Sequence, residues 1–111
     1  MTLFSRIPSP RKDLRVAVRY RVRNDVSWYS GRTENLSRTG VLLRINTTVR
    51  ESAQLDLVLK VPARMLESAP CEIVCLGTVT RLATSPAGTP EVGVEFVDVA
   101  TDTLDALIAR L

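Results

Sequence analysis

Residues 16–23 read VAVRYRVR, and every second position in this stretch holds a large apolar or aromatic side chain. Successive side chains of a β-strand point to opposite faces of the sheet, so this alternation predicts a half-buried strand. The side chains predicted to point inward are Val16, Val18, Tyr20 and Val22. The outer face is predicted to be basic and to carry Ala17, Arg19, Arg21 and Arg23.

The rest of the chain continues in short segments of the same kind. Further strands are predicted at residues 28–36, 41–45, 55–61, 71–82 and 91–97. Turn-forming residues separate the strands at 24–25, 37–40, 50–52 and 83–90. One helical turn is expected at 63–66, and Gly77 predicts a bulge or a close approach of backbones within the long segment 71–82.

The C-terminal residues follow a different periodicity. Apolar side chains recur at helical spacing at Leu104, Leu107, Ile108 and Leu111. Thr101 or Asp102 is suited to cap the first turn of the helix that this spacing predicts. Because no helices fall between the six strands, the sheet is expected to be antiparallel. The predicted fold class is therefore mainly β, a six-stranded antiparallel β-barrel with a C-terminal α-helix.

A chain of 111 residues is long enough for one domain with its own hydrophobic core. We divide it into a flexible N-terminal lead, residues 1–10, and a domain that covers residues 11–111. Arg6, Pro8 and Pro10 interrupt any apolar run in the lead, so it does not read as a signal peptide. No segment is long and apolar enough to span a membrane. We therefore expect a cytoplasmic protein without membrane insertion.

Two cysteines and the lack of histidine limit the chemistry that the sequence predicts. On one strand, Cys71 and Cys75 would stand roughly 13 Å apart, too far for a disulfide, so both are expected to be small buried residues. No residues have the spacing of a metal site. No nucleophile is paired with a base, so we expect neither a cofactor nor enzyme activity.

Positive charge gathers near the N-terminus, where seven Lys and Arg residues lie within the first 23 positions. This asymmetry predicts an anionic partner. Arg11 and Arg15 precede the first predicted strand, and Asn35, Ser37 and Gly40 follow in the turn after the second. Arginine pairs bidentately with phosphate and with the N7/O6 edge of guanine. The two segments together therefore predict a nucleotide ligand.

These motifs, Arg-x-x-x-Arg at 11–15 and Asn-x-Ser-x-x-Gly at 35–40, resemble those of the PilZ domain family. Gly93-Val94-Glu95-Phe96 also resembles the last barrel strand of that family, although Pro10 stands where many members carry a basic residue. The likeness covers nearly the whole chain. It implies a stand-alone PilZ domain that is a non-enzymatic receptor for the bacterial second messenger cyclic di-GMP.

The resemblance also implies a role for each motif residue. Arg11 and Arg15 would grip phosphates and guanine edges of the ligand. Asn35 and Ser37 would hydrogen-bond its base and phosphate, and Gly40 would leave space for it. Binding would order the N-terminal lead, and a downstream protein partner would read that change.

Several of these residues also have a purely structural explanation. Asn35 and Ser37 would cap their own turn, and Gly40 would supply a positive φ there. Trp28 and Tyr29 would fill the small core or cover a barrel end, as large aromatic residues often do. Alternatively, the two rings would stack on a base.

Two alternative functions keep the predicted barrel. A PilZ-like protein-interaction module would have the fold without binding a nucleotide. A nucleic-acid-binding barrel would instead use a phosphate track formed by the outward-facing Arg19, Arg21 and Arg23. We expect cyclic di-GMP rather than nucleic acid, because the resemblance to the PilZ family gives both motifs a role.

Overall fold

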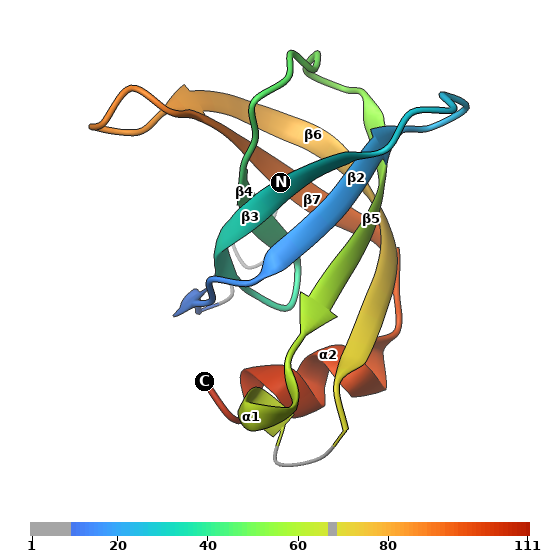
Figure 1. Cartoon of the computed structure of the whole chain (residues 1–111), viewed down its shortest axis with the longest axis vertical. Coiled ribbons are helices and arrows are strands. Elements are labelled where there is room, and N and C mark those ends of the chain that lie inside the picture. Colours follow the sequence, from blue (N-terminus) through green and yellow to red (C-terminus); the bar gives the residue numbers. More distant parts are fainter. Residues whose placement is uncertain (1–9, 67–68) are drawn as a thin grey trace, which may run out of the picture.

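The computed structural model describes residues 10–66 and 69–111 of the chain (Figure 1). The described residues form seven strands and two helices. In chain order these are β1 (Lys12–Asp13), β2 (Ala17–Val22), β3 (Tyr29–Leu36), β4 (Gly40–Arg44), β5 (Gln54–Val61), α1 (Ala63–Leu66), β6 (Cys71–Thr84), β7 (Pro90–Val99) and α2 (Thr101–Ile108). The predicted N-terminal lead lies outside the described residues except for Pro10.

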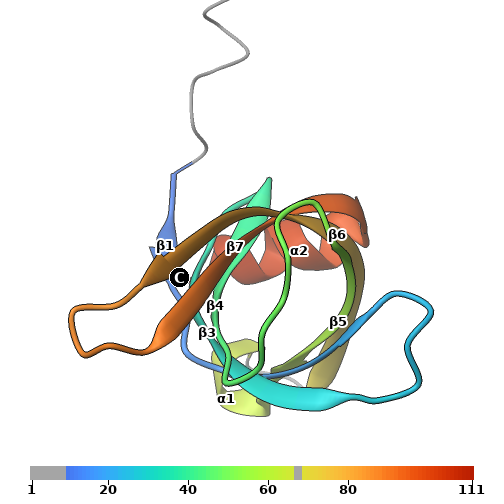
Figure 2. The ribbon, with the colours of Figure 1, turned by 90° about the horizontal axis from the view of Figure 1, so that it is seen from above.

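Six of the strands close into a barrel. The sheet order is β1-β3-β2-β5-β6-β7-β4, and an additional pairing of β3 with β4 closes the ring. Every pair of neighbouring strands is antiparallel. Seen from above, the strands form a ring (Figure 2). The predicted six-stranded antiparallel barrel with a C-terminal helix is therefore confirmed.

Strand β1, which lies outside the closed ring, is not predicted from the sequence. It pairs with the last part of β3, where Lys12 stands opposite Leu36 and Asp13 opposite Asn35. Because β2 pairs with the first part of β3, β1 and β2 follow one another along the same edge of that strand. Two exposed, charged residues show no periodicity, so β1 depends on its pairing with β3.

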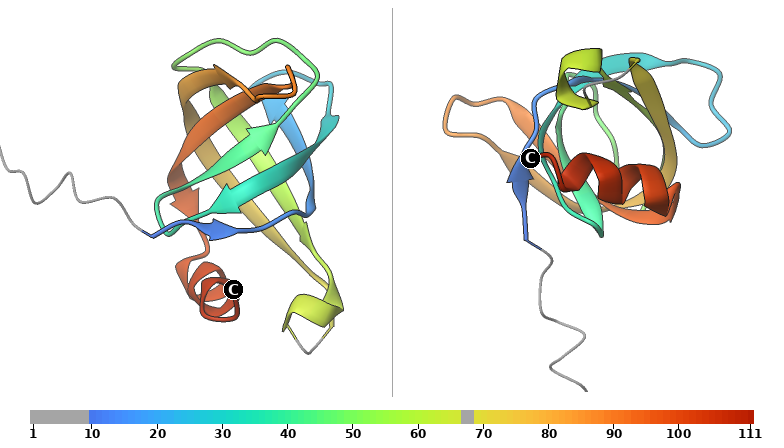
Figure 3. Two further views of the ribbon diagram at one scale, coloured as in Figure 1. Left: turned by 90° about the vertical axis from the view of Figure 1, so that its left-hand side faces the viewer. Right: turned by 90° about the horizontal axis from the view of Figure 1, so that it is seen from below.

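The core holds the side chains that the alternation predicts to point inward. On β2, Val18 and Tyr20 are almost completely buried, while Arg19 between them is exposed. Strand β5 buries alternate side chains in the same way, at Leu55, Leu57, Leu59 and Val61. Helix α2 lies across the lower end of the barrel (Figure 3, right panel), where it buries Leu104 and Leu107. The apolar spacing of the C-terminal residues thus closes one end of the barrel.

The predicted N-cap of the C-terminal helix is wrong. Ala100 is the N-cap of α2, and it makes no side-chain capping bond. Thr101 and Asp102 instead belong to the first turn of the helix. The Leu104 N–H donates to the Ala100 carbonyl at 3.0 Å, so the backbone begins the helix before either predicted side chain. Burial of the apolar face therefore fixes the start of α2 without a side-chain cap.

Both cysteines are free, in agreement with the prediction that they form no disulfide. Cys75 is buried in β6, and desolvation raises the pKa of its thiol to about 12, so the thiol stays protonated at neutral pH. Cys71 is only half-buried, contrary to the prediction. It stands opposite Val61 at the very end of the β5–β6 ladder and packs against the edge of the core.

The prediction that Trp28 fills the core or covers a barrel end is also wrong. Its ring lies on the outer face, with the guanidinium carbons of Arg19 and Arg21 at 5.4 and 4.6 Å from the ring centroid. Tyr29 stands opposite Tyr20, and the two ring centroids are 5.8 Å apart. Tyr29 lies at the beginning of β3 and is 42 % exposed. Neither aromatic residue is therefore part of the buried core.

Gly77 lies where the register between β6 and β7 shifts. Strand β7 has one extra residue opposite the step from Leu76 to Gly77, which confirms the predicted bulge. A Cβ atom at Gly77 would overlap the side chain of Val94 and would come within 2.9 Å of the Glu95 carbonyl oxygen. Glycine is thus required here by the close approach of the two strands.

We expect Gly77→Ala to lower the free energy of unfolding by about 1–3 kcal/mol, because an added methyl group would displace its packed neighbours. Urea denaturation followed by circular dichroism measures this change. Val74→Ala is the control on the same strand, since the Val74 side chain is 65 % exposed, and it should change stability by less than about 0.5 kcal/mol. Equal stability of Gly77→Ala and the wild type would contradict the close approach.

Candidate ligand-binding site

An open groove of about 150 Å³ lies on the outer surface of the barrel. It crosses β3, β4, β7 and β6, the first three of which face the viewer in the left panel of Figure 3. Four of the five residues predicted for the site line this groove, namely Arg11, Asn35, Ser37 and Gly40. The fold therefore brings the first motif beside the second.

Ser37 forms the turn that carries the second motif. Its hydroxyl oxygen accepts hydrogen bonds from the backbone N–H groups of Thr39 and Gly40, both at 3.2 Å. Its own N–H donates to the Gly40 carbonyl at 2.9 Å. The residue is almost fully buried. These bonds match the turn-capping alternative and fix the shape of one side of the groove.

Gly40 and Asn35 stand on neighbouring strands of the groove. Gly40 has no positive φ, so the expectation that it supplies one is wrong. A Cβ atom there would overlap the carbonyl group of Val94, so the close approach of β4 and β7 requires the glycine. Asn35 is half-buried, and its side-chain amide has no hydrogen-bond partner among the residues that the structure describes. This amide is therefore available to a ligand.

The backbone around Arg15 is fixed by a buried threonine. Thr33 is fully buried on β3, where its hydroxyl oxygen accepts from the Val16 N–H at 3.0 Å and its hydroxyl donates to the Leu14 carbonyl. Leu14 and Val16 are themselves buried in the core. Arg15 stands between them with its side chain exposed, so the position of its Cα is set by residues inside the barrel.

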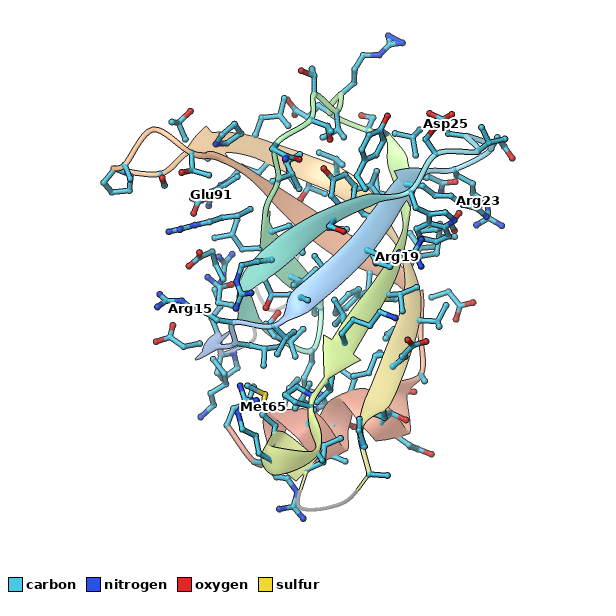
Figure 4. All side chains as sticks on the ribbon, viewed as in Figure 1. Arg15, Arg19, Arg23, Asp25, Met65 and Glu91 are labelled. Atoms are coloured by element: carbon cyan, nitrogen blue, oxygen red, sulfur yellow. The ribbon has the colours of Figure 1, made fainter. Side chains whose placement is uncertain are left out.

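Arg15 is the one predicted site residue that does not line the groove. Its Nε lies 3.4 Å from Oε2 of Glu34, the residue immediately before Asn35. Glu34 is 12 % exposed and also forms an ion pair with Arg44, whose Nε lies 3.7 Å from Glu91. Figure 4 shows Arg15 and Glu91 on the same side of the barrel. Arg15 is thus held beside the groove by the Glu34 carboxylate, which is also paired with Arg44.

The second motif is also connected to the C-terminal helix. Arg38, one of its variable positions, pairs with Asp105 of α2 through two contacts, Nε to Oδ1 at 3.0 Å and NH2 to Oδ2 at 3.2 Å. Both side chains are well exposed, so solvent and salt screen this pair. The turn and the helix are therefore linked by a bidentate but weak ion pair.

The opposite side of the groove is not predicted from the sequence. Arg81 of β6 and Glu95 of β7 line it, and neither forms an ion pair within residues 10–66 and 69–111. Alternation within β7 marks Glu95 as outward-facing. In β6, however, Arg81 is two residues after the buried Val79, so alternation alone would point it inward, and the register shift between these two residues turns it outward. The register between β6 and β7 is what places them beside the second motif, and a local pattern does not show that register.

The charged side chains that line the groove are Arg11, Arg81 and Glu95. The two guanidinium groups favour an anionic ligand with planar acceptor edges. In the part of the chain that the structure describes, no three His, Cys, Asp or Glu side chains are grouped to hold a metal ion. Among these same residues, no helix is long and apolar enough to cross a membrane.

The structure is thus a small, closed β-barrel domain, and the groove on its outer face, lined by two arginines and one glutamate, is its candidate ligand site. The PilZ domain model matches residues 5–111, and the chain therefore belongs to the PilZ domain family. Cyclic di-GMP is the ligand for which this family is known. Among proteins with curated descriptions, none matches the sequence.

Solved structures share the fold. The inhibitor of motility MotI/DgrA from Bacillus subtilis aligns with a TM-score of 0.74 and 18 % identity over 90 % of this chain, which spans 48 % of that protein. The PilZ domain of YcgR from Escherichia coli aligns with a TM-score of 0.70 and 13 % identity, over 96 % of this chain and 91 % of that one. The PilZ domain of CeSA from a cellulose-synthesizing bacterium aligns with a TM-score of 0.62 and 13 % identity, over 90 % of this chain and 92 % of that one. At these identities the similarity shows the fold, a PilZ-type barrel.

We expect Thr33→Val to lower the free energy of unfolding by about 1–3 kcal/mol, because the buried Val16 N–H and Leu14 carbonyl would lose their partner. Thr33→Ser is the matched control, since it keeps the hydroxyl group and should retain most of the stability. Urea denaturation measures both variants. A Thr33→Val protein as stable as the wild type would show that the hydroxyl does not hold the Arg15 segment.

Proposed function

We propose that this PilZ domain is a non-enzymatic receptor that binds cyclic di-GMP at the groove. One observation carries the proposal: Arg11 of the first motif and Asn35, Ser37 and Gly40 of the second line the same groove. The YcgR PilZ domain, which shares the fold, has been solved with cyclic di-GMP. The geometry of the groove and its charges are consistent with this ligand.

The groove accommodates one part of a dinucleotide. At about 150 Å³ it is smaller than the sites of roughly 300–1,000 Å³ that bury drug-sized ligands. One base would therefore enter the groove, and the phosphates would lie toward β1, where Arg11 and Arg15 stand. Two guanidinium groups on that side match the two phosphates of the ligand.

Arg15 would exchange Glu34 for a ligand phosphate. Its side chain is 66 % exposed, so the present ion pair is weakened by solvent. A phosphate accepts two parallel hydrogen bonds from a guanidinium group and is the stronger partner. Glu34 would keep its contact with Arg44, so this largely buried carboxylate is not left without a cation.

Isothermal titration calorimetry with cyclic di-GMP tests the proposal. We expect saturable binding by the wild type and a loss of about 10-fold or more in affinity for Arg11→Ala and for Arg15→Ala, because each would remove one bidentate contact. No heat with the wild type would overturn the proposed function and would favour a protein-interaction module that binds no nucleotide.

Arg19→Ala is the matched control for loss of charge. In Figure 4 Arg15 lies at the left, just before β2, and Arg19 lies farther to the right along that strand. The Arg19 guanidinium lies over Trp28, and Arg19 does not line the groove. We expect this variant to bind cyclic di-GMP like the wild type. If instead Arg19→Ala lost affinity, and other polyanions bound with a steep dependence on salt, the nucleic-acid alternative would replace the proposal.

The proposed receptor acts through a change in its N-terminal segment and a protein partner. Arg11 and Arg15 lie at the end of this segment, so ligand bound to them would restrain the residues that precede β1. The output then requires contact with a downstream protein. Because the ligand is a bacterial second messenger, we place this receptor in the cytoplasm.

A nuclear magnetic resonance titration tests this restraint. Cyclic di-GMP should shift backbone amides in residues 9–16 (except Pro10, which has no N–H), in residues 35–41 and in the groove-lining residues of β6 and β7. It should also raise the heteronuclear NOE of residues before Lys12, because the bound segment would move less. The Arg15→Ala protein is the control and should show neither change. Shifts at the groove without any change in the NOE would remove the restraint from the proposal and leave the binding site.

A further inference from the structure

A row of four residues crosses the groove on neighbouring strands. Asn35 on β3 pairs with Leu42 on β4, Leu42 pairs with Gly93 on β7, and Gly93 pairs with Arg81 on β6. With neighbouring strands about 4.8 Å apart, this row spans about 14 Å between its end residues. It places a side-chain amide at one end and a guanidinium group at the other, with two half-buried positions between them.

The middle of the row suits a flat ring. Gly93 has no positive φ, so the local backbone does not require a glycine. A Cβ atom there would lie 3.3 Å from Cβ of Arg81, so the missing side chain leaves the surface open beside Arg81. Leu42 next to it is apolar and half-buried. Together they form a small apolar surface on which a planar base can lie.

Arg81 is held at the edge of this surface. The register of β6 against β7 shifts between Val79 and Arg81, and the hydroxyl of Thr80 donates to the Gly93 carbonyl at 3.4 Å. The Arg81 guanidinium has no ionic partner among the described residues. Its N–H donors are therefore available for planar acceptors in the groove.

Glu95 adds an acceptor on the same side of the groove. It lies two residues beyond Gly93 on the same face of β7, opposite Gly40. A carboxylate repels a phosphate, but it accepts hydrogen bonds from N–H groups. Guanine carries the acceptors O6 and N7 on one edge and the donors N1–H and N2–H2 on the adjacent edge. Arg81 and Glu95 offer the complementary pair of groups.

We propose that Leu42, Gly93, Arg81 and Glu95 form a guanine subsite, in which Arg81 reads O6 and N7 and Glu95 reads N1–H and N2–H2. The inference rests on the proposed function, because it assigns the reading of the base within the same groove. Arg11 and Arg15 then bind phosphates on the opposite side. Adenine would present its N6 amino group to Arg81, so this subsite selects guanine.

Two modified ligands test the two contacts by calorimetry. One is cyclic di-GMP with both N7 atoms replaced by C–H groups, and the other is cyclic di-IMP, which lacks the 2-amino groups. We expect the wild type to bind each about 10-fold or more weakly than cyclic di-GMP. The Arg81→Ala protein should bind the N7-substituted ligand as tightly as it binds cyclic di-GMP. The Glu95→Ala protein should likewise bind cyclic di-IMP as tightly as it binds cyclic di-GMP.

Each variant is the control for the other, because Arg81→Ala should stay sensitive to the amino group and Glu95→Ala to N7. Both side chains are exposed, so the variants should unfold at the wild-type temperature. If each variant kept the full wild-type penalty for its own modified ligand, the subsite would be wrong while the proposed function stood. If the wild type did not bind cyclic di-GMP at all, both would fail.

Discussion

Strand β3 is hydrogen-bonded along both of its edges, and the rest of the structure depends on this double pairing. On one edge it pairs with β2 and then with β1, and on the other edge β4 closes the barrel. Closure places the turn at residues 35–40 between the Arg-x-x-x-Arg segment and β7. Without the β3–β4 ladder, the two sides of the groove would stand at opposite ends of an open sheet. The candidate site therefore exists only because the barrel is closed by the pairing of β3 with β4.

Two neighbouring side chains of β3 hold Arg15 in position, one from inside the barrel and one from outside. The Thr33 hydroxyl bonds the backbone on both sides of Arg15 inside the barrel, and Glu34 holds the guanidinium group outside it. Much of the backbone freedom of this segment is thus already lost before any ligand arrives. Preorganisation of this kind lowers the entropy cost of binding. The site combines a fixed backbone with a side chain that needs only a rotation to change partner.

Alternation and turn residues predicted most of the fold, from the inward face of β2 to the helical turn at α1, because burial on one face repeats along each strand. Strand β1 was not predicted, because its two residues are both charged and too few to show an alternation of apolar and polar side chains. The motifs predicted one side of the groove through the chemistry of Arg11 and Asn35. Arg81 could not be predicted in the same way, because its place depends on two register shifts between β6 and β7. Such shifts arise from packing between strands that are far apart in sequence.

The position of β1 at the end of the sheet has a consequence for solubility. Within residues 10–66 and 69–111 no strand pairs with its outer edge, and such edges can recruit strands of other molecules into intermolecular sheets. Here the edge is two residues long, both side chains are charged and exposed, and Pro10 lacks the N–H group that an added strand would need. The segment that carries Arg11 can therefore stay open to solvent without acting as a template for aggregation.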